Sequence, residues 1–472
     1  MTLEKFKIKE RFNEIKSQLE GQKEAIPPQT QLTVSMLIQL VELIIIVFEE
    51  RFTKKNSKNS SIPPSKGSTK KKRSRFMSKN KLPVIPDPLE GRPADEVIDI
   101  FPDYCHDCGL ELEHSKYGSF ESRQVLDIVI ESYVTEYRVH HVDCPCCGHE
   151  QIGQFPSGII APLQYGPMIK ALSISMLFAQ MSSYSRTQVM MMELVGRSLS
   201  QATLVGFVSS LYSKLASWEK WATDQLLNFP VMHADETGFN LNGTNAWIHV
   251  LSNENIVLMN CHLKRGGDAI NDIGIIPQYK GILVHDFWQA YYQYDELEHA
   301  ACGAHLLREL EFIIDAHQHK WAILMRDVLL AALELVNKRK KDKLLDREYQ
   351  SIKRRYRIAV TKGEKECPSP ELSGKRGKTA KTKARNLLER FKDHEEEILR
   401  FARDPVVPFT NNIAERDLRM VKVKQNVSGF FRSETGAKAF CRIRSYLLTQ
   451  WRKGIPPIQA LKLAIEGNIN YE

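Results

Sequence analysis

Three carboxylates that lie far apart in the sequence are the strongest candidates for shared chemistry. Asp235 lies inside "VMHADETGFNL", an apolar run that is typical of a strand, and Asp286 ends a second such run, "GILVHDF". Strands disfavour aspartate, and burying an unpaired carboxylate is costly. If the two strands are neighbours in one sheet, their aspartates lie close together. Glu415, early in the predicted helix that opens at "TNNIAERDLRMVKVKQ", is a third carboxylate that could join them.

Converging carboxylates in a water-poor site repel one another unless a divalent cation offsets their charge. Oxygen ligands suit Mg²⁺ or Mn²⁺. Two such ions, about 3.5–4 Å apart, would activate a water or a 3′-hydroxyl and stabilise the leaving oxygen in phosphoryl transfer. We therefore expect Asp235, Asp286 and Glu415 to be catalytic ligands of two Mg²⁺ or Mn²⁺ ions. Arg419 and Lys422 share a helix face with Glu415, which suits a phosphate held beside the metals; a surface salt-bridge ladder is the alternative.

Side chains near these carboxylates carry less specific patterns. Glu236 should point away from Asp235 in an extended strand, so we expect a supporting or surface group. We expect structural roles for His233 and His285, with functional roles as the alternative. Cys302 and His305 form a CxxH pair, which alone offers too few ligands for a metal site, so we expect packing roles with function as the alternative. Three aromatic residues could either stack on unpaired bases or pack in the core: Trp288, Tyr291 and Tyr292.

Two CxxCG motifs, "CHDCG" and "CPCCG", provide a second set of candidate ligands. Strand-like sequence between them completes the pattern of a zinc ribbon. Four cysteines can close a tetrahedral thiolate site for a structural Zn²⁺, because four protein ligands leave no open position: Cys105, Cys108, Cys144 and Cys147. Cys146 and His141 are substitute ligands, and reduced cysteines without metal are the alternative reading.

The elements that must position these groups follow one another in ordered segments. Strand patterns after Pro230, a long helical stretch and a late helix predict an α/β fold with an insertion. A helix, a turn at Gly196 and a second helix outline a helix-turn-helix, with ordinary helical packing as the alternative. The predicted segments are a helical or coiled-coil region (1–55), a basic linker (56–88), a zinc-ribbon-like domain (89–155), a helical region (156–228), the first part of a catalytic core (229–300), a helical insertion (301–404), the second part of the core (405–455) and a C-terminal tail (456–472).

Charge and composition favour a DNA-associated protein without a membrane span. The 472 residues carry a net charge of +9, and residues 51–75 hold ten Lys or Arg and no acid. Such runs, including a second at 375–385, bind polyanions or form solvated linkers. The charged N-terminus and the short apolar run at 32–48 argue against a signal peptide and a membrane span, so we expect a cytoplasmic, nucleoid-associated protein. The candidate DNA contacts are Arg419, Lys422, Lys424, Lys70, Lys71, Lys72 and Arg73.

The motifs, taken in their order, resemble the transposases of the insertion-sequence 66 family, which are DDE enzymes. The blocks that carry the resemblance are "NSKNSSIPPSKG", the paired CxxCG motifs, "HADETGF", "GILVHDFWQAYYQY", "ACGAHLLREL" and "TNNIAERDLRMVKVKQNVSGFFRSETGAKAF". The resemblance implies an RNase H-like mixed sheet with Asp235, Asp286 and Glu415 as the metal-binding triad. The 129 residues from Asp286 to Glu415 are long for an uninterrupted core of this kind, which indicates a helical insertion.

The resemblance also implies what the protein acts on. A transposase binds the ends of its element, cuts DNA with divalent metal ions and joins the free 3′-hydroxyl to target DNA. Two ends must be cut together, so we expect a homodimer on DNA, and small accessory proteins of the element are further candidate partners. The alternatives are a structure-selective nuclease of the same fold without strand transfer, and a DNA-binding regulator derived from a transposase.

Overall fold

The computed structural model describes residues 2–21, 94–112 and 121–471, apart from 129, 341, 370–380 and 430, and single positions between 31 and 41. The first predicted helix is present as α1 (Thr2–Gly21). The predicted basic linker, with Lys70, Lys71, Lys72 and Arg73, lies outside the described residues. None of the described helices combines the length and the apolar character that crossing a membrane requires.

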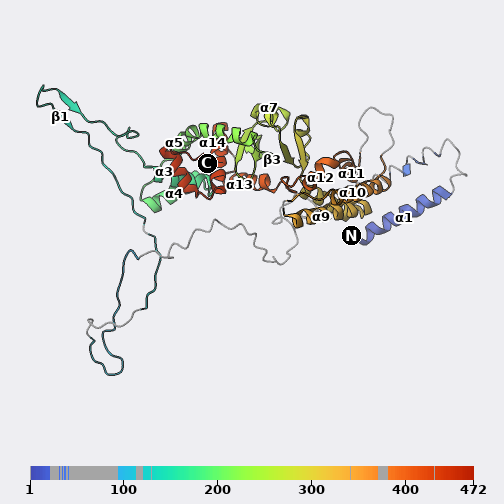
Figure 1. Ribbon diagram of the computed structural model, residues 1–472, viewed down its shortest axis with the longest axis horizontal. Helices are drawn as coiled ribbons and strands as arrows, with labels where there is room; N and C mark the ends of the chain where they lie inside the picture. The colour runs from blue at the N-terminus through green and yellow to red at the C-terminus, as the bar shows by residue number, and fades with distance from the viewer. Residues whose placement is uncertain are drawn as a thin grey trace.

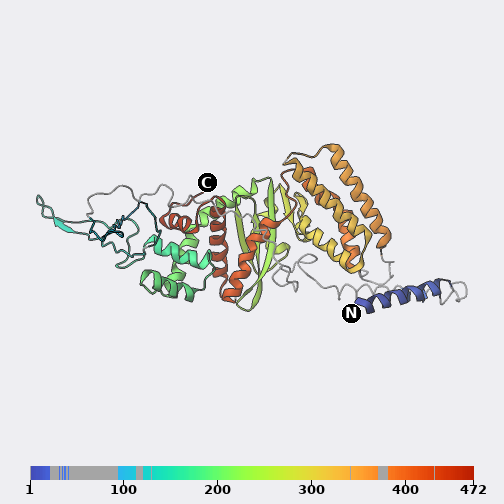
Figure 2. The ribbon, with the colours of Figure 1, turned by 90° about the horizontal axis from the view of Figure 1, so that it is seen from below.

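A mixed five-stranded sheet forms the centre of the molecule (Figures 1 and 2). β3, β4 and β5 form an antiparallel meander, and β6 and β7 continue the sheet parallel to β3. The strand order is β5-β4-β3-β6-β7. The strands are β3 (Val231–Leu241), β4 (Thr244–Ser252), β5 (Val257–His262), β6 (Ile282–His285) and β7 (Glu298–Ala301). The predicted mixed α/β fold is therefore confirmed.

Helices that precede and follow the strands in the sequence pack on one side of this sheet (Figure 2). α13 (Asn412–Ser428) covers β3 and β4, and α14 (Glu434–Arg452) lies against the edge strand β5. Side chains of α14 accept hydrogen bonds from β5 backbone N–H groups, Met259 to Ser445 at 2.8 Å and Val257 to Thr449 at 3.1 Å. Helix α14 thereby satisfies donors that an exposed edge would leave unpaired.

The remaining helices on this side precede the sheet or end the chain. Trp218 and Tyr446 are fully buried among them, with ring centroids 5.2 Å apart in an edge-on arrangement. Residues 457–466, in the predicted tail, are helical and pack on α3. These helices are α3 (Pro167–Phe178), α4 (Tyr184–Val195), α5 (Gln201–Lys214), α6 (Ala216–Leu227) and α15 (Pro457–Glu466). A short helix, α7 (Gly267–Ile273), connects β5 toward β6.

A second helical body occupies the stretch between β7 and α13 and lies on the opposite side of the sheet (Figure 2). It has its own core, in which Trp321, Tyr356 and Phe391 are fully buried. Its helices are α8 (Gly303–His317), α9 (Lys320–Arg339), α10 (Asp346–Glu366), α11 (Lys383–Asp393) and α12 (Glu395–Arg403). The body begins and ends at one point, because the N–H of Gly303 donates to the carbonyl of Phe409 at 2.8 Å.

The region of the CxxCG motifs forms only part of the predicted zinc ribbon. β1 (His141–Asp143) and β2 (Glu150–Ile152) pair on either side of the second motif. The strand-like sequence before β1 carries no strand within residues 121–128 and 130–140, and apolar side chains such as Val125 and Val134 are exposed. The alternating pattern lacks an apposed layer to bury it, and two strands alone are marginally stable.

Candidate active site

Asp235 and Asp286 lie level with each other on neighbouring strands. The parallel register pairs His233 of β3 with Val284 of β6, so the aspartates two residues further on occupy equivalent positions. The chain turns directly after Asp286, because the next residue adopts a left-handed backbone with φ of 71°. Such strain in a non-glycine residue is frequent beside functional groups. Asp235, within β3, and Asp286, directly after β6, therefore present both carboxylates at one place on the sheet.

Asn411 fastens the beginning of α13 to β3 beside these carboxylates. It occupies the N-cap position, as the sequence suggests, but its buried side chain does not cap the helix. The side chain instead donates to the carbonyl of Ala234 at 2.8 Å and accepts from Nδ1 of His233 at 2.8 Å. Glu415, one helical turn further on, is thus brought close to Asp235.

The pKa of Asp235 shows that the carboxylates share one charged cluster. Burial, followed by the negative charges of Glu236, Asp286 and Glu415, raises this pKa from 3.8 to about 8. A hydrogen bond from the backbone N–H of Glu236 to Asp235 Oδ1, at 2.8 Å, opposes the rise. The cluster lacks the positive charge that would keep all its members ionised.

Glu236 is a buried fourth carboxylate rather than the surface group that remained open from the sequence. Its side chain is 1% exposed. It accepts hydrogen bonds from Arg265 at 2.6 and 3.1 Å and from the hydroxyl of Tyr291 at 2.9 Å. The guanidinium of Arg265 lies between the rings of Trp247 and Trp288, 4.7 and 4.6 Å from their centroids. This stacked arginine holds the carboxylate beside the aspartates.

The histidines near the site make internal contacts. Burial lowers the pKa of His233 to about 4 and that of His285 to about 3, so both imidazoles are neutral at pH 7. His285 is packed against the rings of Tyr291 and Tyr292, with centroids 5.0 and 5.1 Å away, and its Nε2 lies 3.1 Å from Nδ1 of His299. These contacts favour structural roles for the histidines, while Trp288 and Tyr292 are partly exposed and Tyr291 is buried.

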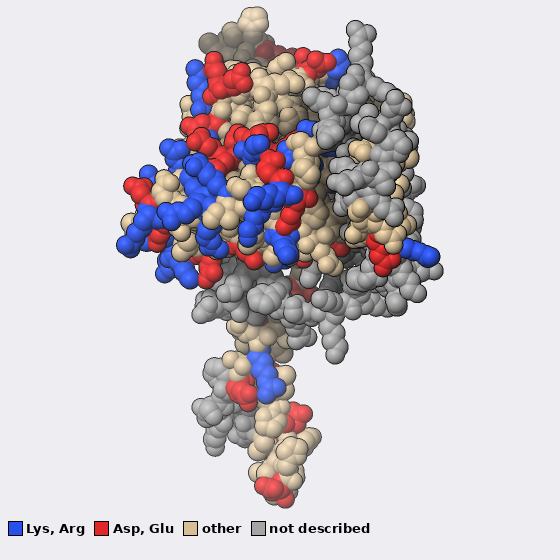
Figure 3. Space-filling model, turned by 90° about the vertical axis from the view of Figure 1, so that its right-hand side faces the viewer, with Lys and Arg blue, Asp and Glu red and all other residues tan. Residues whose placement is uncertain are grey.

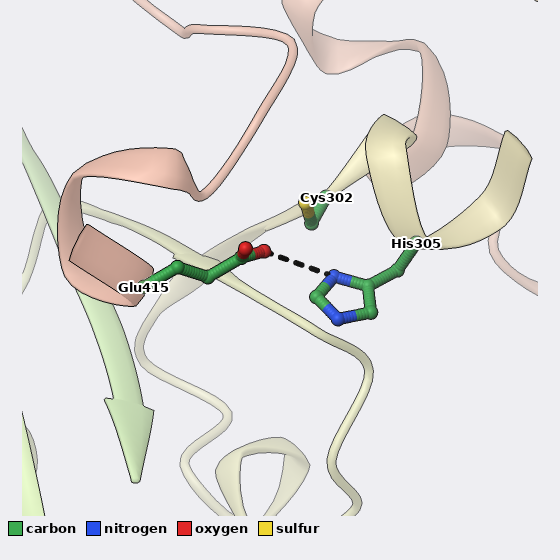
Figure 4. Close-up of side chains that lie close together, drawn as sticks. All are labelled: Cys302, His305 and Glu415. Carbon is green, nitrogen blue, oxygen red and sulfur yellow. Dashed lines mark ion pairs between the residues drawn. The ribbon is translucent and has the colours of Figure 1, made fainter. Parts of the chain in front are cut away.

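Glu415 is turned toward α8 (Figure 4). Its Oε1 lies 3.6 Å from Nδ1 of His305 and 3.8 Å from the guanidinium of Arg308. Among the described residues, the set of three possible metal ligands within 4.8 Å of one another is Cys302, His305 and Glu415. The three triad carboxylates are not gathered that closely. Electrostatics favours this placement, because Glu415 lies near the guanidinium of Arg308 on α8 and away from the negative charges of the aspartates.

A comparison with protein families now bears on these residues. The model described as "Transposase IS66 family" matches residues 162–439, which is more than half of the chain. The chain belongs to the IS66 family of transposases. A search of curated proteins finds no match. Membership supports a transposase function, with DNA as the partner and divalent metal ions in use, and it confirms the resemblance seen in the sequence.

The cysteine motifs precede the residues that match the IS66 family. Gly109 and Gly148 have left-handed φ angles of 73° and 69°, which close a turn around each motif. Backbone hydrogen bonds lower the pKa of Cys105 and of Cys144, which favours the metal-binding thiolate. Within the described part of the chain, however, the four cysteines of the two turns do not come together as one set of ligands. The zinc site stays a prediction.

The IS66-matched region contains the predicted helix-turn-helix outline. α4 ends at Gly196, whose φ is 67°, and the side chain of Ser200 accepts the N–H of Thr203 at 3.0 Å to begin α5. The turn is held by Gln188, whose side-chain amide donates to the carbonyl of Leu199 at 2.6 Å. The turn that the sequence predicts at Gly196 is therefore present, while a DNA-binding role stays a prediction.

The predicted cations of α13 differ in their availability. Arg419 is exposed. The ammonium group of Lys422 donates to the carbonyl of Gly238 on β3. Lys424 donates to the carbonyl of Ser182 at 3.1 Å, and burial lowers its pKa to about 8. Two of the three side chains thus hold α13 against its neighbours, and Arg419 is the cation that faces solvent.

The second basic run of the sequence, at 375–385, is described from residue 381 onward. Lys381 pairs with Glu389 at 2.6 Å. Arg385 is 5% exposed and pairs with Glu364 at 2.6 Å and with Glu389 at 2.9 Å. These ion pairs stabilise the packing of α11 on α10, so the described end of the run does not form the free basic surface that the sequence suggested.

Helix α10 carries a basic face that the sequence analysis did not single out. Figure 3 views the molecule from the side of the second helical body, where Lys and Arg side chains gather with acidic groups among them. Lys353, Arg354, Arg357 and Lys362 recur at helical spacing along a shallow depression. Lys353 and Arg357 pair with Glu395 at 3.1 and 2.9 Å, while the other two are exposed. The cluster of Lys and Arg within residues 353–362 was the available signal in the sequence.

Proposed function

We propose that this protein is a DDE transposase that cuts DNA at the ends of its element and joins them to a target. Asp235, Asp286 and Glu415 are its catalytic carboxylates. The observation that carries the proposal is the parallel register of β3 and β6, which sets two half-buried aspartates side by side. The mixed sheet, with an antiparallel meander followed by two parallel strands, supports an RNase H-like core.

The carboxylates fit a site for Mg²⁺ or Mn²⁺. Their donors are hard oxygen atoms, and the raised pKa of Asp235 marks a surplus of negative charge. Arg265 offsets the charge of Glu236, while Asp235 and Asp286 have no ion pair with a Lys or Arg of the described chain. A divalent cation bound there would neutralise developing charge and lower the pKa of an attacking water.

The protein groups around the cations have separate tasks in this proposal. Asp235, within β3, and Asp286, directly after β6, would hold the cations on a rigid sheet, which would fix their position relative to the scissile phosphate. Exposed Arg419 lies one turn beyond Glu415 on α13 and binds a neighbouring phosphate. The basic face of α10 binds DNA backbone further away, as phosphate contacts position a protein without reading sequence. The α4–α5 helix-turn-helix reads the element ends, and two copies act together on DNA.

The proposal is tested with Asp286→Asn in the full chain. Labelled duplexes that carry the element ends are incubated with Mg²⁺, and binding and nicking are measured separately. We expect the variant to bind the ends like wild type and to lose nicking by at least about 10³-fold, because the carboxylate acts only in catalysis. Asp295→Asn, the same change at an exposed residue nearby, should nick normally. Undiminished nicking by Asp286→Asn would refute the proposed site.

Precut ends distinguish a transposase from a nuclease of the same fold. Duplexes with a free 3′-hydroxyl at the element end are mixed with a plasmid target. A transposase joins them, since water and a 3′-hydroxyl are equivalent nucleophiles at one metal site. Cleavage of uncut ends without any joined product from precut ends would favour the structure-selective nuclease.

A further inference from the structure

Cys302, His305 and Glu415 come from two helices and meet beside the proposed catalytic centre (Figure 4). Cys302 follows β7 and occupies the N-cap position of α8, and His305 lies in the first turn of that helix. Glu415 reaches toward them from α13. A CxxH pair alone offers too few ligands for a metal ion, but the structure adds a carboxylate that is more than 100 residues away in the sequence.

The facing atoms of this cluster lack hydrogen-bond partners. His305 Nδ1 and Glu415 Oε1 are both buried, and neither makes a hydrogen bond within the described part of the chain. They lie 3.6 Å apart, which is too far for a good hydrogen bond. Two ligand atoms bound about 2.0–2.1 Å from one tetrahedral Zn²⁺ lie roughly 3.3–3.4 Å apart. The gap is therefore close to the one that a shared ion would bridge.

The sulfur atom of Cys302 is placed as a metal-bound thiolate would be. It is fully buried and accepts the backbone N–H of Asn411 at 3.1 Å. It lies within 4.8 Å of both the histidine nitrogen and the glutamate oxygen. Because Asn411 also fastens α13 to β3, the sulfur is held in register with the helix that carries Glu415. Sulfur and imidazole ligands select Zn²⁺ over Mg²⁺.

We propose that Cys302, His305 and Glu415 bind Zn²⁺, with a fourth position left to water, and that Zn²⁺ bound there inhibits the transposase. One carboxylate cannot serve both centres, so zinc keeps Glu415 on α8 and away from Asp235 and Asp286. The inhibition rests on the proposed function, whereas the metal site itself does not. In the resting protein the glutamate already faces the zinc ligands.

The site is tested with Co²⁺, which replaces Zn²⁺ and reports thiolate ligation by a charge-transfer band in the near ultraviolet. The parent is the full chain in which the five cysteines of residues 105–147 are serine, so that the CxxCG motifs cannot contribute. We expect it to bind one equivalent of Co²⁺ with this band, and Zn²⁺ to abolish the band. Cys302→Ser should remove it, while Cys367→Ser, at a buried cysteine of α10's C-terminus, should retain it.

A second variant distinguishes the loss of a metal ligand from a general loss of folding. His305→Ala should keep the thiolate band and weaken Co²⁺ binding at least about tenfold, with an unchanged circular dichroism spectrum. A parent that binds no Co²⁺, or a band that persists in Cys302→Ser, would overturn the site.

Regulation is tested by the ratio of Mg²⁺-dependent nicking with and without micromolar Zn²⁺, measured within each variant. The ratio should fall at least about tenfold in the parent and far less in His305→Ala. Equal inhibition of both would overturn the regulatory half of the proposal. Absence of nicking in every variant would count against the proposed function, while the Co²⁺ band would still decide the metal site.

Discussion

Asp235→Asn tests the carboxylate cluster through folding stability, without any DNA. Burial and the charges of Glu236 and Asp286 raise the pKa of Asp235 from 3.8 to about 8 in the folded protein. In the unfolded chain the same carboxyl group ionises near its ordinary value. Between these two pH values the folded protein keeps a proton that the unfolded chain has lost. The stabilisation from this group is therefore complete below about pH 4 and is lost as the pH rises through about 8.

The size of the effect follows from the same two values. A rise from 3.8 to about 8, at about 1.4 kcal/mol per pH unit, corresponds to roughly 6 kcal/mol once the pH exceeds about 8. Asparagine is neutral at every pH, and its oxygen can still accept the N–H of Glu236 that Asp235 accepts at 2.8 Å. The variant should therefore be more stable than wild type in alkaline solution, and the advantage should shrink toward acidic pH.

The assay is thermal unfolding followed by circular dichroism from about pH 5 to about pH 9, with and without Mg²⁺. Asp224→Asn, at an exposed position of α6, is the control and should change stability by less than about 0.5 kcal/mol. Mg²⁺ should raise the wild-type midpoint at alkaline pH and leave that of Asp235→Asn unchanged. A difference between variant and wild type that stays constant across this pH range would show that Asp235 lies outside any charge cluster.

Two further predictions concern buried contacts that support the site. Asp417 is almost fully buried and pairs with Arg452 at 2.7 Å. Arg452→Met leaves Asp417 as an isolated charge and should lower the free energy of unfolding by about 3–5 kcal/mol in urea at neutral pH. A loss of stability that does not shrink in acid would contradict this cause. Gly303→Ala places a methyl group against the Phe409 ring and should cost about 1–3 kcal/mol, whereas Gly206→Ala, where space is open, should be neutral or stabilising; equal midpoints for the two would refute the close packing.

The sequence predicted those features of the fold that depend on the local pattern of apolar and polar residues. Apolar runs before Asp235 and Asp286 were enough to place two strands, although β3 continues past Asp235 to Leu241 while Asp286 directly follows β6. The alternation of a strand also predicted that Glu236 points to the other face, but it carries no information on what covers that face. Glu236, which the sequence predicted to be a supporting or surface group, is buried because its carboxylate pairs with Arg265, and Arg265 is stacked between two tryptophans.

The orientation of Glu415 could not be read in advance either. It depends on how α8 lies relative to α13, and these helices are separated in the sequence by α9, α10, α11 and α12. The predicted ribbon strands illustrate the opposite case. Residues 121–140 have the alternation of a strand, but Val125 and Val134 are exposed, because a periodic pattern needs a second layer, or a metal crosslink, before it becomes a sheet.

The meeting of Gly303 with Phe409, at 2.8 Å between N–H and carbonyl, has a consequence for how this enzyme can change. The second helical body leaves the core at Gly303 and returns to it at Phe409, and these two residues are hydrogen-bonded neighbours. The two ends of the insertion are therefore adjacent in the catalytic core. The helices of this insertion beyond α8 can vary in number and kind without moving the two ends of the core, because those ends are already adjacent. The core and these helices can therefore evolve separately, although they belong to one chain.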